Sequence, residues 1–184
     1  MLNSSQKLKT SVFSLTGHIK KLNQLKYNIM QEIERKFLLK DDSFKKEDYR
    51  SSTITQGYIS TDPERTVRVR LEESHFGYKF KTGYLTIKGK NNESGVSRYE
   101  WETEMEFDDA EDLMKLCKPG VIKKIRYRID VGKHTYEVDE FLNKNKGLII
   151  AEIELNFEEE KFEKPIWLGE EVTGNKKYYN VNLK

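Results

Sequence analysis

Cysteine and histidine are scarce in this chain of 184 residues, which contains one cysteine and three histidines. The single Cys117 excludes an intrachain disulfide and a cysteine-based metal cluster. His18, His75 and His134 lack the spacing of metal ligands, so a bound metal would take oxygen ligands, as Mg²⁺, Mn²⁺ or Ca²⁺ do. Apolar runs are also short, and none approaches the ~20 residues that a membrane-spanning helix needs.

Acidic residues are absent from residues 1–31, which contain five lysines. Of the 33 basic and 31 acidic side chains, 28 and 31 therefore belong to the rest of the chain, which has a net charge of −3. This balance argues against nucleic-acid binding by bulk positive charge.

The first 29 residues are rich in Ser, Asn and Lys and lack the continuous apolar segment of a secretory signal. We expect residues 1–29 to be a poorly ordered leader or a start-site extension. A weak amphipathic helix over residues 17–29 is the alternative. Residues 30–184 are expected to form one domain, because their length suits a single core.

The charged segment Glu32-Ile33-Glu34-Arg35-Lys36 has a pattern that suits a functional site on a strand. Side chains alternate between the two faces of a strand, so Glu32, Glu34 and Lys36 share one face. Carboxylates can hold a hard divalent cation and an amine can bind a phosphate oxygen. Taken alone, this single segment is better explained by a solvated strand face.

The same every-second-residue placement of charge recurs along the chain, with an apolar or aromatic residue between the charged ones. The further examples are Arg68/Arg70, Arg98/Glu100/Glu102, Arg126/Arg128, Glu137/Asp139 and Glu152/Glu154. Repetition favours a closed barrel in which one face of every strand points inward. Inward charges must be paired or bound by a ligand, and a polyanion with a divalent metal would satisfy both signs.

The pattern predicts a mainly β (α+β) protein whose strands are joined by short turns and loops. We expect strands near 31–40, 52–60, 65–73, 78–88, 97–107, 121–131, 134–141 and 147–156. A helix is expected from a cap at Asp108 or Asp109 to about Cys117, with Leu113, Met114 and Leu116 against the barrel wall. A second short helix is expected over residues 157–163.

Several motifs in order resemble the CYTH domain of the triphosphate tunnel metalloenzyme superfamily. They are Glu32–Lys36 (ExExK), Gln56-Gly57-Tyr58, Arg68-Val69-Arg70, Lys88, Ser97–Glu102, Arg126-Tyr127, Val138-Asp139, Ala151–Glu154 and Gly169–Thr173. The resemblance covers about Met30 to Leu183 and is closest to small bacterial inorganic tripolyphosphatases. It implies a closed eight-stranded antiparallel β-barrel, a triphosphate tunnel, with a few helices packed outside.

The resemblance also implies roles for particular residues. Mg²⁺ or Mn²⁺ would be held by Glu32, Glu34, Glu152 and Glu154, with Asp139 as a further candidate. Phosphate oxygens would be bound by Lys36, Arg68, Arg70, Lys88 and Arg126. Glu100 and Glu102 would support the site by orienting water or a second metal.

Two positions carry open interpretations. Tyr58 is either a packing residue or, as the resemblance implies, the partner of Lys36 in a catalytic dyad. In that dyad the ammonium would lower the pKa of the phenol, which could then accept a proton from the attacking water. Lys177 stands where the family often has arginine, and it is either a phosphate ligand or part of a solvated pair with Lys176.

The resulting prediction is a metal-dependent triphosphatase that acts on tripolyphosphate or an organic triphosphate and releases orthophosphate. The alternatives are a thiamine or nucleoside triphosphatase, a CYTH-type adenylyl cyclase, and a polyphosphate- or nucleotide-binding module without turnover. A further alternative, from a third class of protein, is a structural barrel without ligand, whose charged strands face solvent on an open sheet. We expect a cytoplasmic protein with no membrane or nucleic-acid partner, and the resemblance leaves a homodimer open.

Overall fold

The computed structural model describes residues 30–75, 77 and 80–183. The predicted leader, residues 1–29, lies outside the described residues. The strands are β1 (Gln31–Leu39), β2 (Tyr49–Asp62), β3 (Arg65–Ser74), β4 (Lys81–Gly89), β5 (Ser97–Met105), β6 (Ile122–Val131), β7 (His134–Phe141), β8 (Ile149–Glu154) and β9 (Leu168–Glu171). The helices are α2 (Phe107–Met114) and the 3₁₀ turns η1 (Ser43–Lys46), η2 (Asn143–Asn145), η3 (Lys176–Tyr178) and η4 (Asn180–Asn182).

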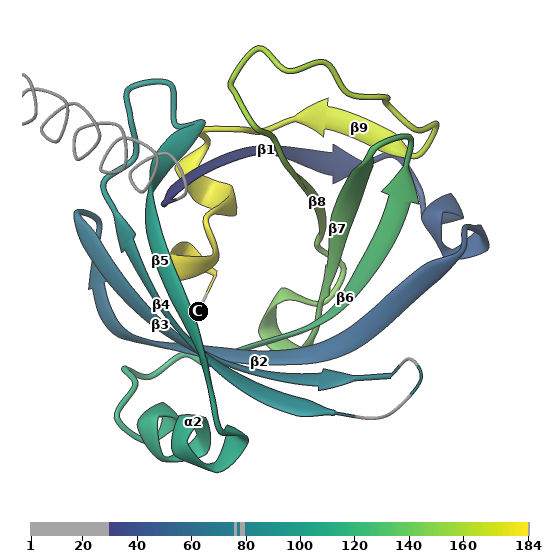
Figure 1. Ribbon diagram of the computed structural model, residues 1–184. Helices are drawn as coiled ribbons and strands as arrows, with labels where there is room; N and C mark the ends of the chain where they lie inside the picture. The colour runs from purple at the N-terminus through teal and green to yellow at the C-terminus, as the bar shows by residue number, and fades with distance from the viewer. Residues whose placement is uncertain (1–29, 76, 78–79, 184) are drawn as a thin grey trace, which may run out of the picture. The chain divides into compact units, whose positions relative to one another are not determined.

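The strands form one sheet in the order β5-β4-β3-β2-β6-β7-β8-β1-β9. A further pairing between β5 and β1 closes the first eight strands of this order into a ring (Figure 1). Neighbours in the ring are antiparallel, and β9 adds to part of the free edge of β1. The predicted eight-stranded antiparallel barrel is therefore confirmed, and β9 is a short strand that the sequence pattern did not predict.

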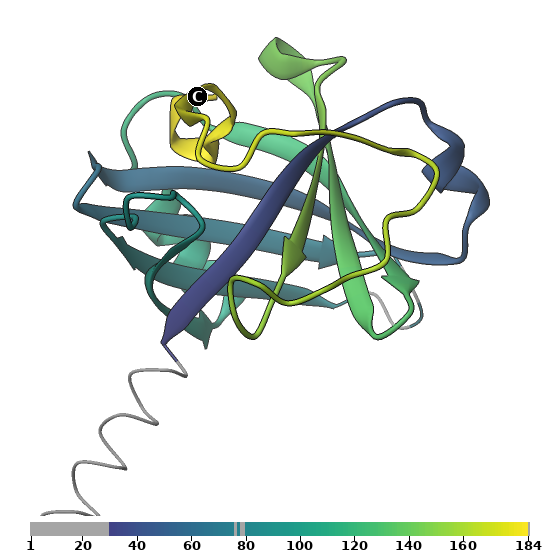
Figure 2. The same ribbon diagram turned by 90° about the horizontal axis from the view of Figure 1, so that it is seen from above.

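The main hydrophobic core lies outside the barrel wall. Phe37, Tyr127, Val138 and Ile153 alternate with the inward-facing charged residues, and all four are buried. Element η1 and the segment 155–168 lie outside this part of the wall (Figure 2). Phe44 and Trp167 from these segments are completely buried in the same cluster. Apolar burial on the outer face thus supplies stability and leaves the inner face free to be polar.

Helix α2 packs on β2, β3 and β4 on another part of the outer wall (Figure 1). It starts after Glu106, not at Asp108 or Asp109, and no side chain caps it. Ala110 is its buried residue, whereas Leu116 is exposed, so the expected packing of Leu116 is wrong. A Cβ on Gly83 would lie 2.4 Å from the Cβ of Ala110, so the glycine permits this close approach.

The helix expected over residues 157–163 is also wrong, because this segment forms a turn followed by irregular chain. Glu160 explains the difference. Its buried carboxylate accepts hydrogen bonds from the backbone N–H of Asn156 (2.6 Å) and from Lys133 Nζ (2.6 Å). These contacts tie the segment to the β6–β7 turn, which is a tertiary constraint that helix propensity does not include.

Candidate functional site

A cavity of about 1100 Å³ runs inside the barrel. Residues from the β2–β3 turn and from the β6–β7 turn both line it, and these turns lie at opposite ends of the β2–β6 ladder. Inward-facing cations on its wall are Lys36, Arg68, Arg70, Lys88, Arg98, Arg126 and Arg128. Inward-facing carboxylates are Glu32, Glu34, Glu100, Glu102, Glu137, Glu152 and Glu154. The period-two pattern therefore placed these charges correctly on one face.

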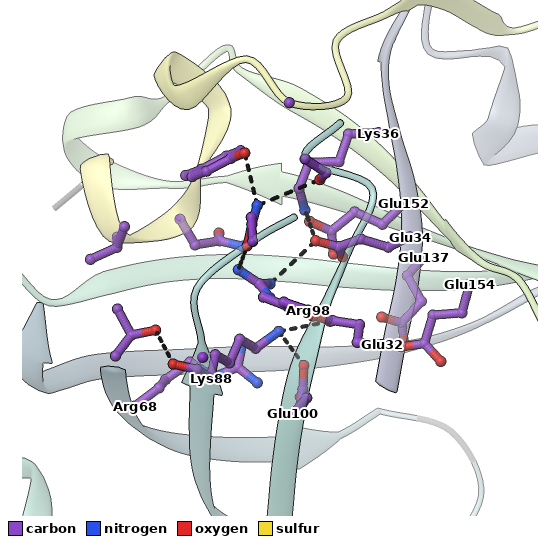
Figure 3. Close-up of a pocket in the computed structure, with 18 of the residues that line it drawn as sticks. Glu32, Glu34, Lys36, Arg68, Lys88, Arg98, Glu100, Glu137, Glu152 and Glu154 are labelled. Atoms are coloured by element: carbon purple, nitrogen blue, oxygen red, sulfur yellow. Dashed lines mark hydrogen bonds and ion pairs between the residues drawn. The ribbon is translucent and has the colours of Figure 1, made fainter. Parts of the chain in front are cut away.

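Strand β1 directs Glu32, Glu34 and Lys36 into the cavity (Figure 3). The ammonium of Lys36 lies 3.0 Å from Glu34 Oε1 and donates a hydrogen bond to Glu152 Oε1. Burial alone would lower the pKa of Lys36, but the carboxylates of Glu152 and Glu34 outweigh it and raise the pKa above its usual value. Lys36 is therefore a positively charged group that could bind a phosphate oxygen.

Arg98 on β5 lies beside both glutamates of the β1 segment (Figure 3). Its Nε is 2.7 Å from Glu32 Oε2 and its Nη2 is 3.3 Å from Glu34 Oε1. Burial lowers its pKa, but Glu32 and Glu34 more than offset this and raise it. Sequence reasoning placed Arg98 on the charged face but did not select it as a site residue, although it stands two residues before Glu100.

The predicted phosphate ligands on β3 and β4 are each paired with a glutamate. Lys88 Nζ lies 2.7 Å from Glu32 Oε1 and 2.6 Å from Glu100 Oε2. The other pairs join Arg68 to Glu102 at 3.1 Å and Arg70 to Glu102 at 2.8 Å. Burial raises the pKa of Glu100 and Glu102, but the nearby cations outweigh it, so both pKa values lie below the usual range. The two predicted supporting residues thus hold the cations in place.

Asp139 differs from the other carboxylates because it does not line the cavity and is completely buried. Its two oxygens accept hydrogen bonds from Arg126 Nε and Nη2, both at 2.7 Å, and from Lys124 Nζ at 2.5 Å. Burial opposes ionisation, but these two cations keep the pKa of Asp139 below its usual value. This geometry holds Arg126 in place, and a role of Asp139 as a metal ligand stays a prediction.

Glu152 and Glu154 on β8 face the cavity in different states. Glu152 accepts hydrogen bonds from Lys36 and from Arg126 Nη2 (3.1 Å), and these cations overcome burial and hold its pKa well below its usual value. For Glu154, no hydrogen bond or ion pair links it to any described residue. Burial and the neighbouring carboxylates, Glu137 first, raise the pKa of Glu154 to about 7.

The donor set fits a hard divalent cation in composition. Seven carboxylates face one cavity, at Glu32, Glu34, Glu100, Glu102, Glu137, Glu152 and Glu154. Burial first and the neighbouring carboxylates second raise the pKa of Glu154, and a cation bound beside it would favour its ionised form. Within the described part of the chain, however, no three Asp, Glu, His or Cys side chains already surround one point as a metal site. Most of these carboxylates form ion pairs with lysine and arginine side chains instead.

Tyr58 lies against the cavity but does not contact Lys36 through any hydrogen bond between described atoms. Its hydroxyl accepts a hydrogen bond from Gln56 Nε2 at 3.2 Å. Burial raises the pKa of Tyr58 to about 12, although Arg68, Arg98 and Lys36 act in the opposite direction. In this arrangement the phenol is protonated at neutral pH, which is opposite to the expected shift.

The end of the chain closes an apolar part of the barrel interior. Tyr178, Val181 and Leu183 pack against a buried cluster that includes Tyr58 and Phe141. Lys177 is exposed and does not line the cavity, because η3 directs it outward. The structure therefore does not bring Lys177 to the other predicted phosphate ligands.

A segment just before η3 supports Lys36 directly. The backbone N–H of Lys36 donates to Thr173 Oγ1 at 3.0 Å, and its carbonyl accepts from the N–H of Val172 at 2.8 Å. Thr173 Oγ1 also donates to Glu171 Oε1 at 2.9 Å. The Gly169–Thr173 motif thus hydrogen-bonds to the backbone of β1, a role that its sequence alone does not indicate.

The fold and site define a class of protein: a β-tunnel whose inward cations and carboxylates suit a polyanion together with a hard metal ion. Residues 30–182 match the CYTH domain, and the chain belongs to this family. An inorganic triphosphatase of Acetivibrio thermocellus is 44% identical over 154 residues, which span 83% of this chain and 92% of the relative. An inorganic triphosphatase of Nitrosomonas europaea is 32% identical over 84% of this chain and 97% of the relative.

Solved structures agree with this family. A crystal structure of an inorganic triphosphatase superposes with a TM-score of 0.54 and 27% identity, covering 83% of this chain and 93% of that chain. A conserved hypothetical protein of Pyrococcus furiosus superposes with a TM-score of 0.52 and 26% identity, covering 67% of this chain and 78% of that chain. In the described part of our chain, none of the helices has the length and apolar character needed to cross a membrane.

Proposed function

We propose that this protein is an inorganic triphosphatase that hydrolyses tripolyphosphate inside the barrel with the help of a divalent cation. The observation that carries the proposal is the 44% identity to a bacterial inorganic triphosphatase over most of both chains. The cavity supports it, because cations from five different strands face one space that also holds the carboxyl group of Glu154, which has no hydrogen-bond or ion-pair partner among the described residues. Mg²⁺ or Mn²⁺ is the proposed ion, since the donors are carboxylate oxygens.

The proposed ligands follow the positions of the side chains. Glu32, Glu34, Glu152 and Glu154 would hold the cation, directly or through water, and Asp139 is assigned to positioning Arg126 instead. Phosphate oxygens would be bound by Lys36, Arg68, Arg70, Lys88 and Arg126. Arginine suits this task because its planar fork can donate to two oxygens at once. When bound, the divalent cation would neutralise phosphate charge and polarise a phosphoryl oxygen.

The chain's own contribution is to hold the triphosphate in line with an attacking water and to surround it with fixed charge. Phosphoryl transfer needs little covalent help from the protein, so positioning and neutralisation supply most of the effect. The P–O bond to the terminal phosphoryl group breaks, water oxygen bonds to phosphorus, and orthophosphate leaves with pyrophosphate. Tyr58 is the proposed acceptor of the water proton, which requires that its hydroxyl first release its own proton to solvent. Bound ligands that bring the Lys36 ammonium closer to the Tyr58 oxygen would favour this ionised form.

The test is orthophosphate release from tripolyphosphate, ATP and thiamine triphosphate, with Mg²⁺ or Mn²⁺ and with a chelator. Lys36→Ala and Tyr58→Phe proteins are measured beside Tyr49→Phe, a control on a half-exposed tyrosine outside the cavity. Chelator-sensitive release that prefers tripolyphosphate and is lost only in the first two variants supports the proposal. Preference for ATP or thiamine triphosphate would reassign the substrate, and full activity of Tyr58→Phe would make Tyr58 a packing residue.

Three sequence predictions stay predictions: the start of the domain at residue 30, a cytoplasmic location and a homodimer. A chain begun at Met30 that keeps full stability and activity would support the leader interpretation of residues 1–29. A large loss of either would contradict it. Sedimentation of the full chain would decide between monomer and dimer.

A further inference from the structure

The two glutamates at the start of β1 are held by three cations in the structure. Glu32 bonds to Arg98 and Lys88, and Glu34 bonds to Arg98 and Lys36. Of these cations, Arg98 is the one that bridges both glutamates. Its guanidinium therefore occupies the carboxylate oxygens that a divalent cation would need at this position.

A guanidinium and a divalent cation compete at such a place for two reasons. Both require the lone pairs of the same carboxylate oxygens, and their charges repel each other strongly at short range in a partly buried site. The cavity also offers space for a displaced Arg98 side chain. It lines the cavity, its side chain keeps 19% of its surface exposed, and its Nη1 contact with Asn91 Oδ1 is long at 3.5 Å.

We propose that Arg98 is an exchangeable counter-ion of the metal site. Its guanidinium bridges Glu32 and Glu34 while no divalent cation is bound, and a divalent cation displaces it from them into the cavity. Released there, the guanidinium faces the space in which the triphosphate would bind. This last step rests on the proposed function, whereas the displacement itself does not.

Two consequences follow from the exchange. Without triphosphate, Arg98 weakens cation binding, because each binding event must first break its bonds to the two carboxylates. With triphosphate present, the displaced guanidinium gains a new anionic partner, so each ligand strengthens the binding of the other. Such coupling is reciprocal and is typically about 5- to 150-fold in affinity.

The first experiment measures Mn²⁺ binding without any phosphate, by electron paramagnetic resonance of free Mn²⁺. The variants are Arg98→Gln and Arg70→Gln, which remove the same charge from the tunnel wall. Arg70 contacts Glu102 and not the β1 glutamates, so it reports the general electrostatic effect. We expect Arg98→Gln to bind Mn²⁺ about tenfold more tightly than Arg70→Gln does, and Arg98→Lys to lie near the unmodified protein. Equal or weaker binding by Arg98→Gln would overturn the proposal.

The second experiment observes the displacement in the unmodified protein, and a variant serves only to assign one signal. Arginine Nε–H resonances are recorded by ¹H–¹⁵N NMR, with the Arg98 signal identified by its loss in Arg98→Lys. Mg²⁺ alone should shift this signal strongly, since the bond from Nε to Glu32 is broken, while the Arg35 signal stays in place. An unchanged Arg98 signal at saturating Mg²⁺ would overturn the exchange.

A third measurement tests the link to the triphosphate. Calorimetric titration with the non-hydrolysable imido analogue of tripolyphosphate, with and without Mg²⁺, should show a gain in affinity that Arg98→Gln loses. An equal gain in Arg98→Gln would overturn the release into the triphosphate site. Failure of the proposed hydrolysis would be visible separately, because none of these three measurements depends on turnover.

Discussion

The inner and outer faces of the same strands have opposite chemistry. Lys36 and Phe37 are neighbours on β1, and Glu152 and Ile153 are neighbours on β8, yet the first of each pair faces the cavity and the second is packed outside. The outer face buries its apolar side chains under η1, the segment 155–168 and α2. The inner face buries charges that are paired with each other. Stability is therefore concentrated outside the wall and the candidate site inside it.

The two faces together explain why the barrel can contain so many buried charges. Replacing an ion pair by apolar residues often stabilises a protein, so the paired charges inside the tunnel contribute little net stability. Apolar burial on the other face of the strands makes up for this. Changes to the outer face should then mainly alter stability, and changes to the inner face should mainly alter ligand binding and turnover.

The largest effect on stability is expected for Trp167→Ala. Trp167 is fully buried and contacts Phe44 and Tyr136, with ring centroids 6.3 and 5.3 Å away. We expect the free energy of unfolding to fall by about 3–5 kcal/mol, as for other buried Trp to Ala changes. Urea unfolding measures this, and phosphate release per folded molecule should stay the same. Trp167→Phe should lower the free energy of unfolding by less. A loss of turnover at unchanged stability would contradict the assignment of the outer face to stability alone.

On the inner face, Glu34→Gln should lower tripolyphosphate turnover by about 100-fold or more, as removal of one preorganised charge-stabilising group does. The substitution removes a carboxylate that is proposed to bind the divalent metal ion and that contacts Lys36 and Arg98. Turnover is measured across a range of Mg²⁺ concentrations. The matched control is Glu73→Gln, since Glu73 lies on the outer face and pairs with Lys81. Full activity of Glu34→Gln would contradict the metal assignment.

Thr173→Val tests whether a hydrogen bond to the backbone of β1 affects the position of Lys36 inside the cavity. It removes the oxygen that accepts from the Lys36 backbone N–H and donates to Glu171, at a cost of about 1 kcal/mol in unfolding free energy. We expect a several-fold loss of kcat with KM nearly unchanged if β1 shifts Lys36 away from its working position. Thr173→Ser should restore both quantities. A variant that is less stable but fully active would limit Thr173 to a structural role.

The smallest effect concerns acid stability on the outer face. Hydrogen bonds from Lys133 and from the Asn156 backbone lower the pKa of Glu160 from 4.5 to about 2. A lowered carboxylate pKa contributes stability above its unfolded value of 4.5, and this contribution is lost as the pH falls from about 4.5 to about 2. Urea unfolding at several pH values should therefore show a weaker acid dependence for Glu160→Gln. Glu159→Gln, at an exposed neighbour, should behave like the unmodified protein.

Sequence reasoning located the strands well because strand alternation is a local property of the backbone. All eight predicted strands correspond to strands of the barrel, with ends that differ by a few residues. It failed where distant parts of the chain decide the local structure. Residues 157–163 are not helical because Glu160 is bound by Lys133 in the β6–β7 turn, and Leu116 is exposed because α2 ends before it.

The candidate site shows the same division. Period-two spacing was enough to place Glu32, Lys36, Arg68 and Glu152 on one inward face. It could not separate Asp139 from the cavity carboxylates, because the spacing of Glu137 and Asp139 says nothing of Lys124 and Arg126 beside them. Nor could it show that Lys177 points outward or that Tyr58 is held by Gln56.

The alternating pattern of residues was sufficient to predict the strand-rich class of this protein and the sign of charge at each inward position. The tertiary structure alone decided which charges meet. Arg98 and Glu32 are 66 residues apart, and they bond only because β5 pairs with β1 to close the ring. Alternation follows from the geometry of each strand, whereas partners across the cavity follow from closure and register between strands that are remote in the chain.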